Sequence, residues 1–226
     1  RLTVNQLVPG SIPGRGVMKV TLHKEPFHFI LVDDTYDKFE LDLIWKELDF
    51  LISADKLHGG DGTGTATDMQ GNVLKSNKGI FLEHVYLSRD YSNILTANRK
   101  LFMDEILRPK DSWFFSTQKY DYDSTLISYY EDGDYYRPHQ DDVKVTACTW
   151  FWKEPKLFTG GNLFFPDYDI QIEIQNNSTI LFPSHVRHAV ENVKMDEKDK
   201  GKGHGRICMS QFINYENGSK QDPPKL

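Results

Sequence analysis

Cysteine, excess positive charge and long apolar runs are all scarce or missing in this chain. Its 226 residues include only Cys148 and Cys208, which are too few to staple a small secreted scaffold with disulfides. No run of about 18 apolar residues occurs, so we expect neither a transmembrane helix nor a membrane partner. The net charge is −6, so the chain lacks the positive field that holds a phosphate backbone, and no nucleic-acid partner is expected.

Two further absences concern targeting and nucleotide binding. The amino end has no signal-peptide pattern, which together with the few cysteines favours a cytoplasmic protein, although Arg1 stands in place of methionine and a native leader could have been trimmed. Residues 57–65 hold four glycines but lack the G-x-x-x-x-G-K-[ST] pattern of a phosphate-binding loop. We therefore expect this stretch to be a mobile surface loop or a lid over an active site.

The apolar content is sufficient for one substantial core. With 38% hydrophobic and 13% aromatic residues, the chain is predicted to form a single domain over residues 1–226, in which residues 1–110 or so support a core formed by the remainder. Apolar residues at helical spacing predict a helix over Tyr36 to Ile52, with Asp33-Asp34-Thr35 as its cap. A second helix is predicted over about Asn93 to Leu107, and Pro109 marks its end.

From about residue 111 to 226 the pattern changes to short strands separated by turn residues. The predicted strands are 125–130, 143–152, 162–165, 170–174, 179–182, 188–193 and 206–214. This number of strands predicts a mainly β fold with supporting helices and a jelly-roll core, also called a double-stranded β-helix. The charged segment 195–205 is expected to be a solvated hairpin loop or locally disordered.

The tripeptide His139-Gln140-Asp141, followed later by His188 and Arg206, carries the chemistry. Two imidazoles and one carboxylate suit Fe(II) and leave half of its coordination positions open, as non-haem iron oxygenases require. A 2-oxo acid can fill two open positions and dioxygen the last. The far carboxylate of such a co-substrate needs a cation, and the planar fork of an arginine binds a carboxylate through two hydrogen bonds.

Two neighbouring residues compete for the same roles. Asp142 follows Asp141, but the H-x-D spacing places the first carboxylate in register with His139. His185 stands three positions before His188, and this odd spacing points the two side chains to opposite faces of a strand. We therefore prefer Asp141 and His188 as ligands.

The surroundings of the tripeptide resemble a known family. The stretch from Tyr130 to Asp141 reads Y-x-x-G-x-x-Y-x-x-H-x-D, which resembles the catalytic core of the prolyl 4-hydroxylase branch of the Fe(II)/2-oxoglutarate dioxygenases. Further blocks agree with this family in order, and together they cover about residues 74–214: LKSNKGIFL at 74–82, GGNLFFP at 160–166, LFPSHVRHAV at 181–190 and GRICMSQF at 205–212.

This resemblance implies cofactors and residue roles. Fe(II) would be bound by the catalytic residues His139, Asp141 and His188, with 2-oxoglutarate and dioxygen as co-substrates and ascorbate as a reductant. The co-substrate would be bound by Arg206, Tyr130 and Ser210, and the substrate cleft would be lined by Tyr136, Phe212 and Trp150. Trp150 stands where relatives often place a tyrosine near the far carboxylate. Arg206 is similar to the cation of the oxygen-sensing type, whereas collagen-type enzymes carry lysine.

The resemblance implies hydroxylation of an unactivated C–H bond, with a prolyl residue of a peptide or protein as the preferred substrate. Asp141 favours hydroxylation over halogenation, because a halogenase needs that ligand position for chloride. Three alternatives stay open: a hydroxylase of a free amino acid or other small molecule, a non-catalytic jelly-roll protein that binds a sugar or a metal, and a zinc hydrolase.

Overall fold

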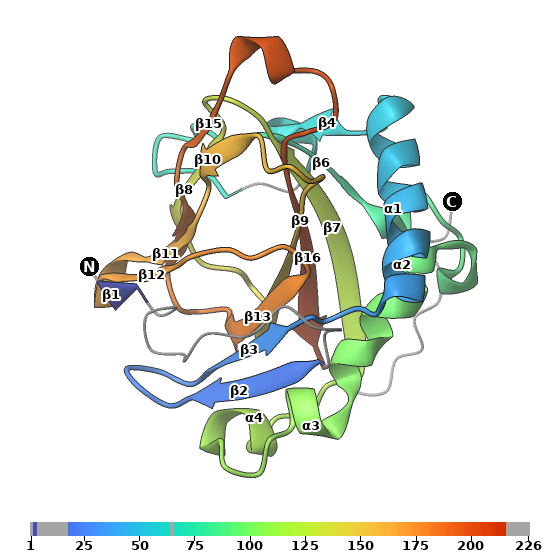
Figure 1. The fold of residues 1–226 in the computed structure, drawn as a ribbon. Helices are drawn as coiled ribbons and strands as arrows, with labels where there is room; N and C mark the ends of the chain where they lie inside the picture. The colour runs from blue at the N-terminus through green and yellow to red at the C-terminus, as the bar shows by residue number, and fades with distance from the viewer. Residues whose placement is uncertain (1, 4–17, 64–65, 216–226) are drawn as a thin grey trace.

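Two β-sheets packed face to face dominate the computed structural model, which describes residues 2–3, 18–63 and 66–215 (Figure 1). The larger sheet has eight strands in the order β2 (Lys19–His23), β3 (Phe29–Asp33), β13 (Ser178–Pro183), β9 (Val145–Phe151), β16 (Arg206–Asn214), β7 (Tyr122–Tyr130), β6 (Lys78–Phe81) and β4 (His58–Gly59). The smaller sheet has six strands in the order β1 (Leu2–Thr3), β12 (Ile170–Ile172), β11 (Leu163–Phe165), β14 (His188–Val190), β8 (Tyr135–His139) and β5 (Lys75–Ser76). A separate antiparallel pair joins β10 (Phe158–Gly160) to β15 (Val193–Met195).

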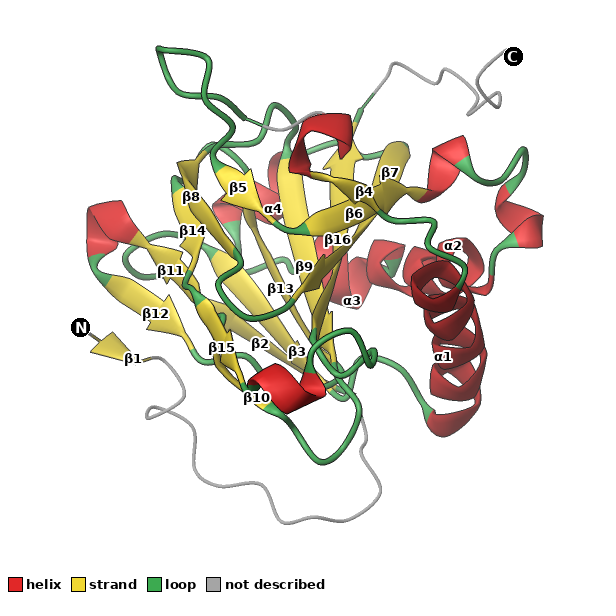
Figure 2. Ribbon diagram, turned by 90° about the horizontal axis from the view of Figure 1, so that it is seen from above, coloured by secondary structure: helices red, strands yellow, loops and turns green. Residues whose placement is uncertain are grey.

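Helices cover the face of the larger sheet that points away from the smaller one, as Figure 2 shows for α1 and α2. The α-helices are α1 (Lys38–Ser53), α2 (Asn93–Ala97), α3 (Asp104–Leu107) and α4 (Trp113–Thr117). The short 3-10 helices are η2 (Gly60–Thr63), η3 (Leu82–His84), η4 (Arg89–Tyr91), η5 (Asn98–Phe102), η6 (Pro166–Tyr168) and η7 (Glu197–Asp199). None of the helices in the described part of the chain has the length and apolar character needed to cross a membrane.

The central strands of the larger sheet are buried on both faces. On β9, Cys148 and Trp150 pack toward the smaller sheet, whereas Phe151 packs with Ile44 and Leu48 of α1. Every residue of β9 is consequently buried, as is typical of a strand covered on both sides. The predicted mainly β fold with a jelly-roll core is confirmed.

The cap predicted for the first helix is wrong. Asp37 caps α1: its Oδ1 accepts a hydrogen bond from the Glu40 backbone nitrogen at 2.9 Å, and Glu40 Oε2 accepts one from the Asp37 nitrogen at 2.8 Å. This reciprocal capping box satisfies two backbone donors that would otherwise lack partners. Thr35 instead contacts β13, through a 2.8 Å hydrogen bond between its hydroxyl and that of Thr179.

The single helix predicted over Asn93 to Leu107 is also wrong, because α2, η5 and α3 occupy this range. Met103, with φ −59° and ψ 138°, leaves the helical conformation between η5 and α3. Asn98 is fully buried and bonds across to the Arg89 guanidinium and the Thr125 hydroxyl. These tertiary contacts fix the chain where helical periodicity alone predicts continuity.

Two segments expected to be loops contain ordered structure. The glycine-rich stretch forms β4 and η2 up to Thr63, which is 3% exposed, while residues 64–65 lie outside the described part; its role as a lid stays a prediction. Met195, expected at the start of a solvated segment, is buried and ends β15. Beyond it, Lys200 Nζ pairs with Asp132 Oδ2 at 3.1 Å, so an ion pair anchors this segment to the turn after β7.

Candidate metal and co-substrate site

All the site residues predicted from the sequence line one cavity between the two sheets. The space between these residues measures about 640 Å³ when the part open to solvent is included. Arg206, Cys208, Ser210 and Phe212 all reach it from one face of β16, as their alternation predicts. The rivals are placed elsewhere: Asp142 and His185 are both exposed, and neither lines the cavity.

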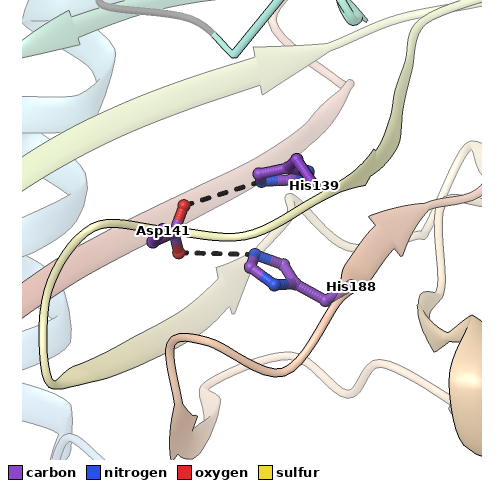
Figure 3. Close-up of side chains that lie close together, drawn as sticks. All are labelled: His139, Asp141 and His188. Atoms are coloured by element: carbon purple, nitrogen blue, oxygen red, sulfur yellow. Dashed lines mark ion pairs between the residues drawn. The ribbon is translucent and has the colours of Figure 1, made fainter. Parts of the chain in front are cut away.

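Strand pairing brings the two histidines together. His139 ends β8 and His188 begins β14, and the two residues are direct partners in the antiparallel ladder. Asp141 lies two residues beyond His139 and turns back toward both rings (Figure 3). Its Oδ1 is 3.7 Å from His139 Nε2, and its Oδ2 is 3.4 Å from His188 Nε2. One ligand atom from each residue lies within 4.8 Å of the others, so the three side chains can share one metal ion.

Hydrogen bonds to the backbone orient both imidazoles. His139 Nδ1 is 2.9 Å from the Arg137 carbonyl oxygen, and His188 Nδ1 is 3.0 Å from the Val186 carbonyl oxygen. Because a carbonyl oxygen only accepts, each Nδ1 carries the proton and donates. Each Nε2 therefore keeps a free lone pair directed at Asp141, which is the tautomer that a metal ligand needs.

The protonation states also suit a metal. Burial, followed by the neighbouring His188, lowers the pKa of His139 to about 3, so its ring is neutral at pH 7. Burial acts to raise the pKa of Asp141, but interactions with the two histidines and a 2.6 Å hydrogen bond from the Thr146 hydroxyl outweigh it and hold the pKa below its usual value. The site thus presents a neutral imidazole at His139 and an ionised carboxylate at Asp141, which are the forms that bind a metal.

Aromatic rings hold the ligands in place. The Tyr136 ring stacks on the His139 ring with centroids 3.5 Å apart and an interplanar angle of 13°. Phe182 packs edge-on against His188 at 4.8 Å. His139 and His188 are 8% and 4% exposed, so the ligands are shielded from water on the sides that these rings cover.

Arg206 lies in the same cavity, at the start of β16, and is 1% exposed. Its guanidinium carbon is 4.7 Å from the centroid of the Tyr130 ring. Nε and Nη1 are buried and have no hydrogen-bond partner in the described part of the chain. Leaving a buried cationic donor unpaired is costly, so this arrangement fits a ligand that brings an anionic acceptor.

The other predicted residues surround these groups. Trp150 is 1% exposed, and its indole Nε1 also lacks a partner among the described residues. The Ser210 hydroxyl lies 3.5 Å from Cys208 Sγ, and Phe212 packs against Phe81 at 6.0 Å. Their assigned roles in binding co-substrate or substrate stay predictions.

Lys75 and Thr63 also line the cavity, and the sequence reasoning did not identify either as a site residue. Lys75 lies on β5, which pairs with β8 opposite Tyr136. Lys75 lies in the block LKSNKGIFL, which resembles the family. The sequence therefore marked this segment as part of the fold but gave no function for Lys75.

Residues 125–214 match the family described as the 2OG-Fe(II) oxygenase superfamily. In this segment, which holds the three candidate metal ligands and Arg206, the chain is similar to that superfamily. An uncharacterized PKHD-type hydroxylase of Synechocystis is 29% identical over 106 residues, which are 38% of this chain and 34% of that protein. The matched region thus spans about a third of the length of this curated relative.

Solved structures share the fold of this chain at low sequence identity. An oxidoreductase of the 2OG-Fe(II) oxygenase family from Burkholderia pseudomallei has a TM-score of 0.53 at 12% identity, covering 85% of this chain and 88% of its own. A prolyl-4-hydroxylase from Pseudomonas putida has a TM-score of 0.50 at 14% identity, covering 83% and 92%. The residues in the cavity of this chain fit the iron and 2-oxoglutarate of the matched superfamily. The donor set suits Fe(II), and Arg206 Nε and Nη1, which lack partners among the described residues, suit a carboxylate of 2-oxoglutarate.

Proposed function

We propose that this protein hydroxylates an unactivated C–H bond of a prolyl residue in a peptide or protein, using Fe(II), 2-oxoglutarate and dioxygen, with ascorbate as reductant. One observation carries the proposal: two imidazole Nε2 atoms and a carboxylate converge in a cavity that also holds Arg206, whose Nε and Nη1 have no partner among the described residues. A binding protein with a jelly-roll fold has no need for that buried cation. A zinc hydrolase needs a general base beside the metal instead.

His139, Asp141 and His188 would hold the iron, and Arg206 would bind the far carboxylate of 2-oxoglutarate. Held by these residues, Fe(II) would supply the activation of dioxygen, coupled to oxidative decarboxylation of 2-oxoglutarate to succinate and carbon dioxide. Thr146 donates to Asp141 and fixes the orientation of its carboxylate. Tyr136 restrains the His139 ring by stacking, and the surrounding aromatic side chains limit access of water to the reacting groups.

A prolyl substrate is supported by the motif that resembles prolyl 4-hydroxylases and by fold similarity to the Pseudomonas putida enzyme of that name. The Synechocystis relative is likewise called a hydroxylase. Because the cavity is part-open to solvent, a peptide has an entry to it.

The test is succinate release by purified protein supplied with Fe(II), 2-oxoglutarate and ascorbate, combined with mass spectrometry of a proline-containing peptide library. We expect peptides to gain the mass of one oxygen atom, and we expect Asp141→Asn to abolish both signals. Asp142, the exposed neighbour of Asp141, offers a matched control, because Asp142→Asn is expected to retain both succinate release and peptide oxidation. Protein that binds iron but neither binds 2-oxoglutarate nor turns it over would rule out the proposed function.

A further inference from the structure

Lys75 is a second buried cation in the same cavity, outside the set of groups that the reaction requires. It is 6% exposed and lies on β5 at the edge of the smaller sheet, opposite Tyr136 in register. A Cβ added at Gly60 would lie 3.2 Å from Lys75 Cγ, so the aliphatic stem is packed under η2. Lys75 also lines the cavity.

At this side of the cavity the Lys75 ammonium, the Tyr136 ring and the His139 ring are neighbours. Lys75 Nζ is 5.4 Å from the centroid of the Tyr136 ring, and the Tyr136 ring stacks on His139. The ammonium group therefore lies close to the metal ligands, one aromatic ring away from His139.

The Lys75 ammonium has no anionic partner of its own. Among the side chains that the structure describes, no carboxylate oxygen lies within the 4.0 Å of an ion pair, and Nζ donates no hydrogen bond. Asp141 acts on it from beyond that distance, and Asp141 is already committed to the metal site. Burial lowers the pKa of Lys75 to about 8, which leaves the amine charged at pH 7.

The cavity therefore holds two cations that have no anionic partner among the described residues, Arg206 on the larger sheet and Lys75 on the smaller one. 2-Oxoglutarate has two carboxylates, and the proposed function uses one at the metal and one at Arg206. A buried charge without a partner is costly, so a third anionic group is expected to approach Lys75.

We propose that Lys75 binds a carboxylate of the primary substrate, so that the hydroxylated molecule carries an anionic group close to the carbon that reacts. This inference rests on the proposed function and narrows its substrate class. The carboxylate is either the free carboxylate of the target residue itself or the side chain of an acidic neighbour in a peptide.

The experiment measures binding by calorimetry to protein loaded with Fe(II) and 2-oxoglutarate under nitrogen. Two matched pairs of probes separate the two sources of carboxylate: N-acetylproline with N-acetylprolinamide, and a capped Ala-Pro-Glu-Ala peptide with its Ala-Pro-Gln-Ala counterpart. In one pair or the other, we expect wild-type protein to bind the carboxylate member about tenfold or more tightly than the neutral member, as for a hydrogen bond between charged groups.

Lys75→Met is expected to abolish that preference and Lys75→Arg to retain part of it, while the affinity for 2-oxoglutarate stays unchanged in both. The exposed Lys78→Met is the matched control and should behave as wild type. If Lys75→Met does not fold, the wild-type comparison and Lys75→Arg still decide the matter.

Several results would overturn the inference. These are equal binding of both members of each pair, binding of no probe, or a loss of 2-oxoglutarate affinity in Lys75→Met that matches the loss in an Arg206 variant. Efficient hydroxylation of a neutral probe would contradict the role of Lys75 but support the proposed function. Selective binding of a carboxylate probe without any succinate release would support the role of Lys75 but contradict the proposed function.

Discussion

Arg206→Met is expected to have opposite effects on stability and on co-substrate binding. Arg206 is 1% exposed, its Nε and Nη1 have no partners among the described residues, and its guanidinium carbon lies 4.7 Å from the centroid of the Tyr130 ring. Methionine keeps much of the side-chain volume and removes the charge. The variant therefore separates the effect of the buried charge on protein stability from its effect on 2-oxoglutarate binding.

The expected magnitudes follow from that environment. Replacing a buried, poorly compensated charge by an apolar group stabilises proteins by about 1 to 4 kcal/mol, and the lost cation–π contact offsets about 0.5 to 2 kcal/mol of this. We expect the free energy of unfolding of the metal-free protein to rise by about 1 to 2 kcal/mol. Loss of a hydrogen-bonded charge pair with the co-substrate costs about 2 to 5 kcal/mol of binding free energy, which lowers the affinity for 2-oxoglutarate roughly 30- to 4000-fold.

Urea unfolding of the apoprotein and calorimetric titration with Fe(II) and then 2-oxoglutarate, under nitrogen, measure both effects. Iron affinity is expected to be unchanged, because Arg206 is not one of the three candidate ligands. Arg89→Met is the control: its guanidinium pairs with buried Asp123 at 3.2 Å and donates to the Leu95 carbonyl oxygen at 2.7 Å. The same substitution there should lower the unfolding free energy by about 2 to 4 kcal/mol. Unchanged 2-oxoglutarate affinity in Arg206→Met, or an equal loss of iron, would refute the reasoning.

Two further predictions concern a glycine and a buried acid. A Cβ at Gly161, where φ is +70°, would lie 2.7 Å from Arg206 Cδ. Gly161→Ala should therefore displace the guanidinium and lower the affinity for 2-oxoglutarate about tenfold, as measured by the same titration. Gly201 has the same φ, and a Cβ there would have no atom within 4 Å, so Gly201→Ala is the control and should leave that affinity unchanged. Burial raises the pKa of Glu83 to about 7, so the native state holds this proton more tightly and stability falls as the pH rises from about 4.5 to 7. Relative to wild type, Glu83→Gln should gain about 1 to 3 kcal/mol of unfolding free energy between pH 5 and pH 8, and a difference that is independent of pH would contradict this.

The fold class and the central triad were predictable because their signals are local. Alternation along residues 206–212 indicates which side chains share a face of the strand, and the structure places these side chains in the cavity. The H-x-D spacing likewise distinguishes Asp141 from Asp142. The capping box formed by Asp37 and Glu40 was equally readable, although the sequence reasoning placed the cap earlier.

Other features depend on contacts between distant parts of the chain. The break at Met103 accompanies hydrogen bonds that Asn98 makes to Arg89 and Thr125, and no helical periodicity contains that information. Lys75 became a site residue only because β5 pairs with β8, which places it opposite Tyr136. In the sequence alone it is one of many lysines in a polar stretch.

The sequence by itself determined the kinds of donor and their order along the chain, because residue type and spacing are properties of the sequence. Tertiary structure decided which nitrogen of each imidazole is free, which cations are left without partners, and how deeply each is buried. These properties depend on the dielectric environment and hydrogen-bond partners of each group, and packing of the two sheets against each other sets both.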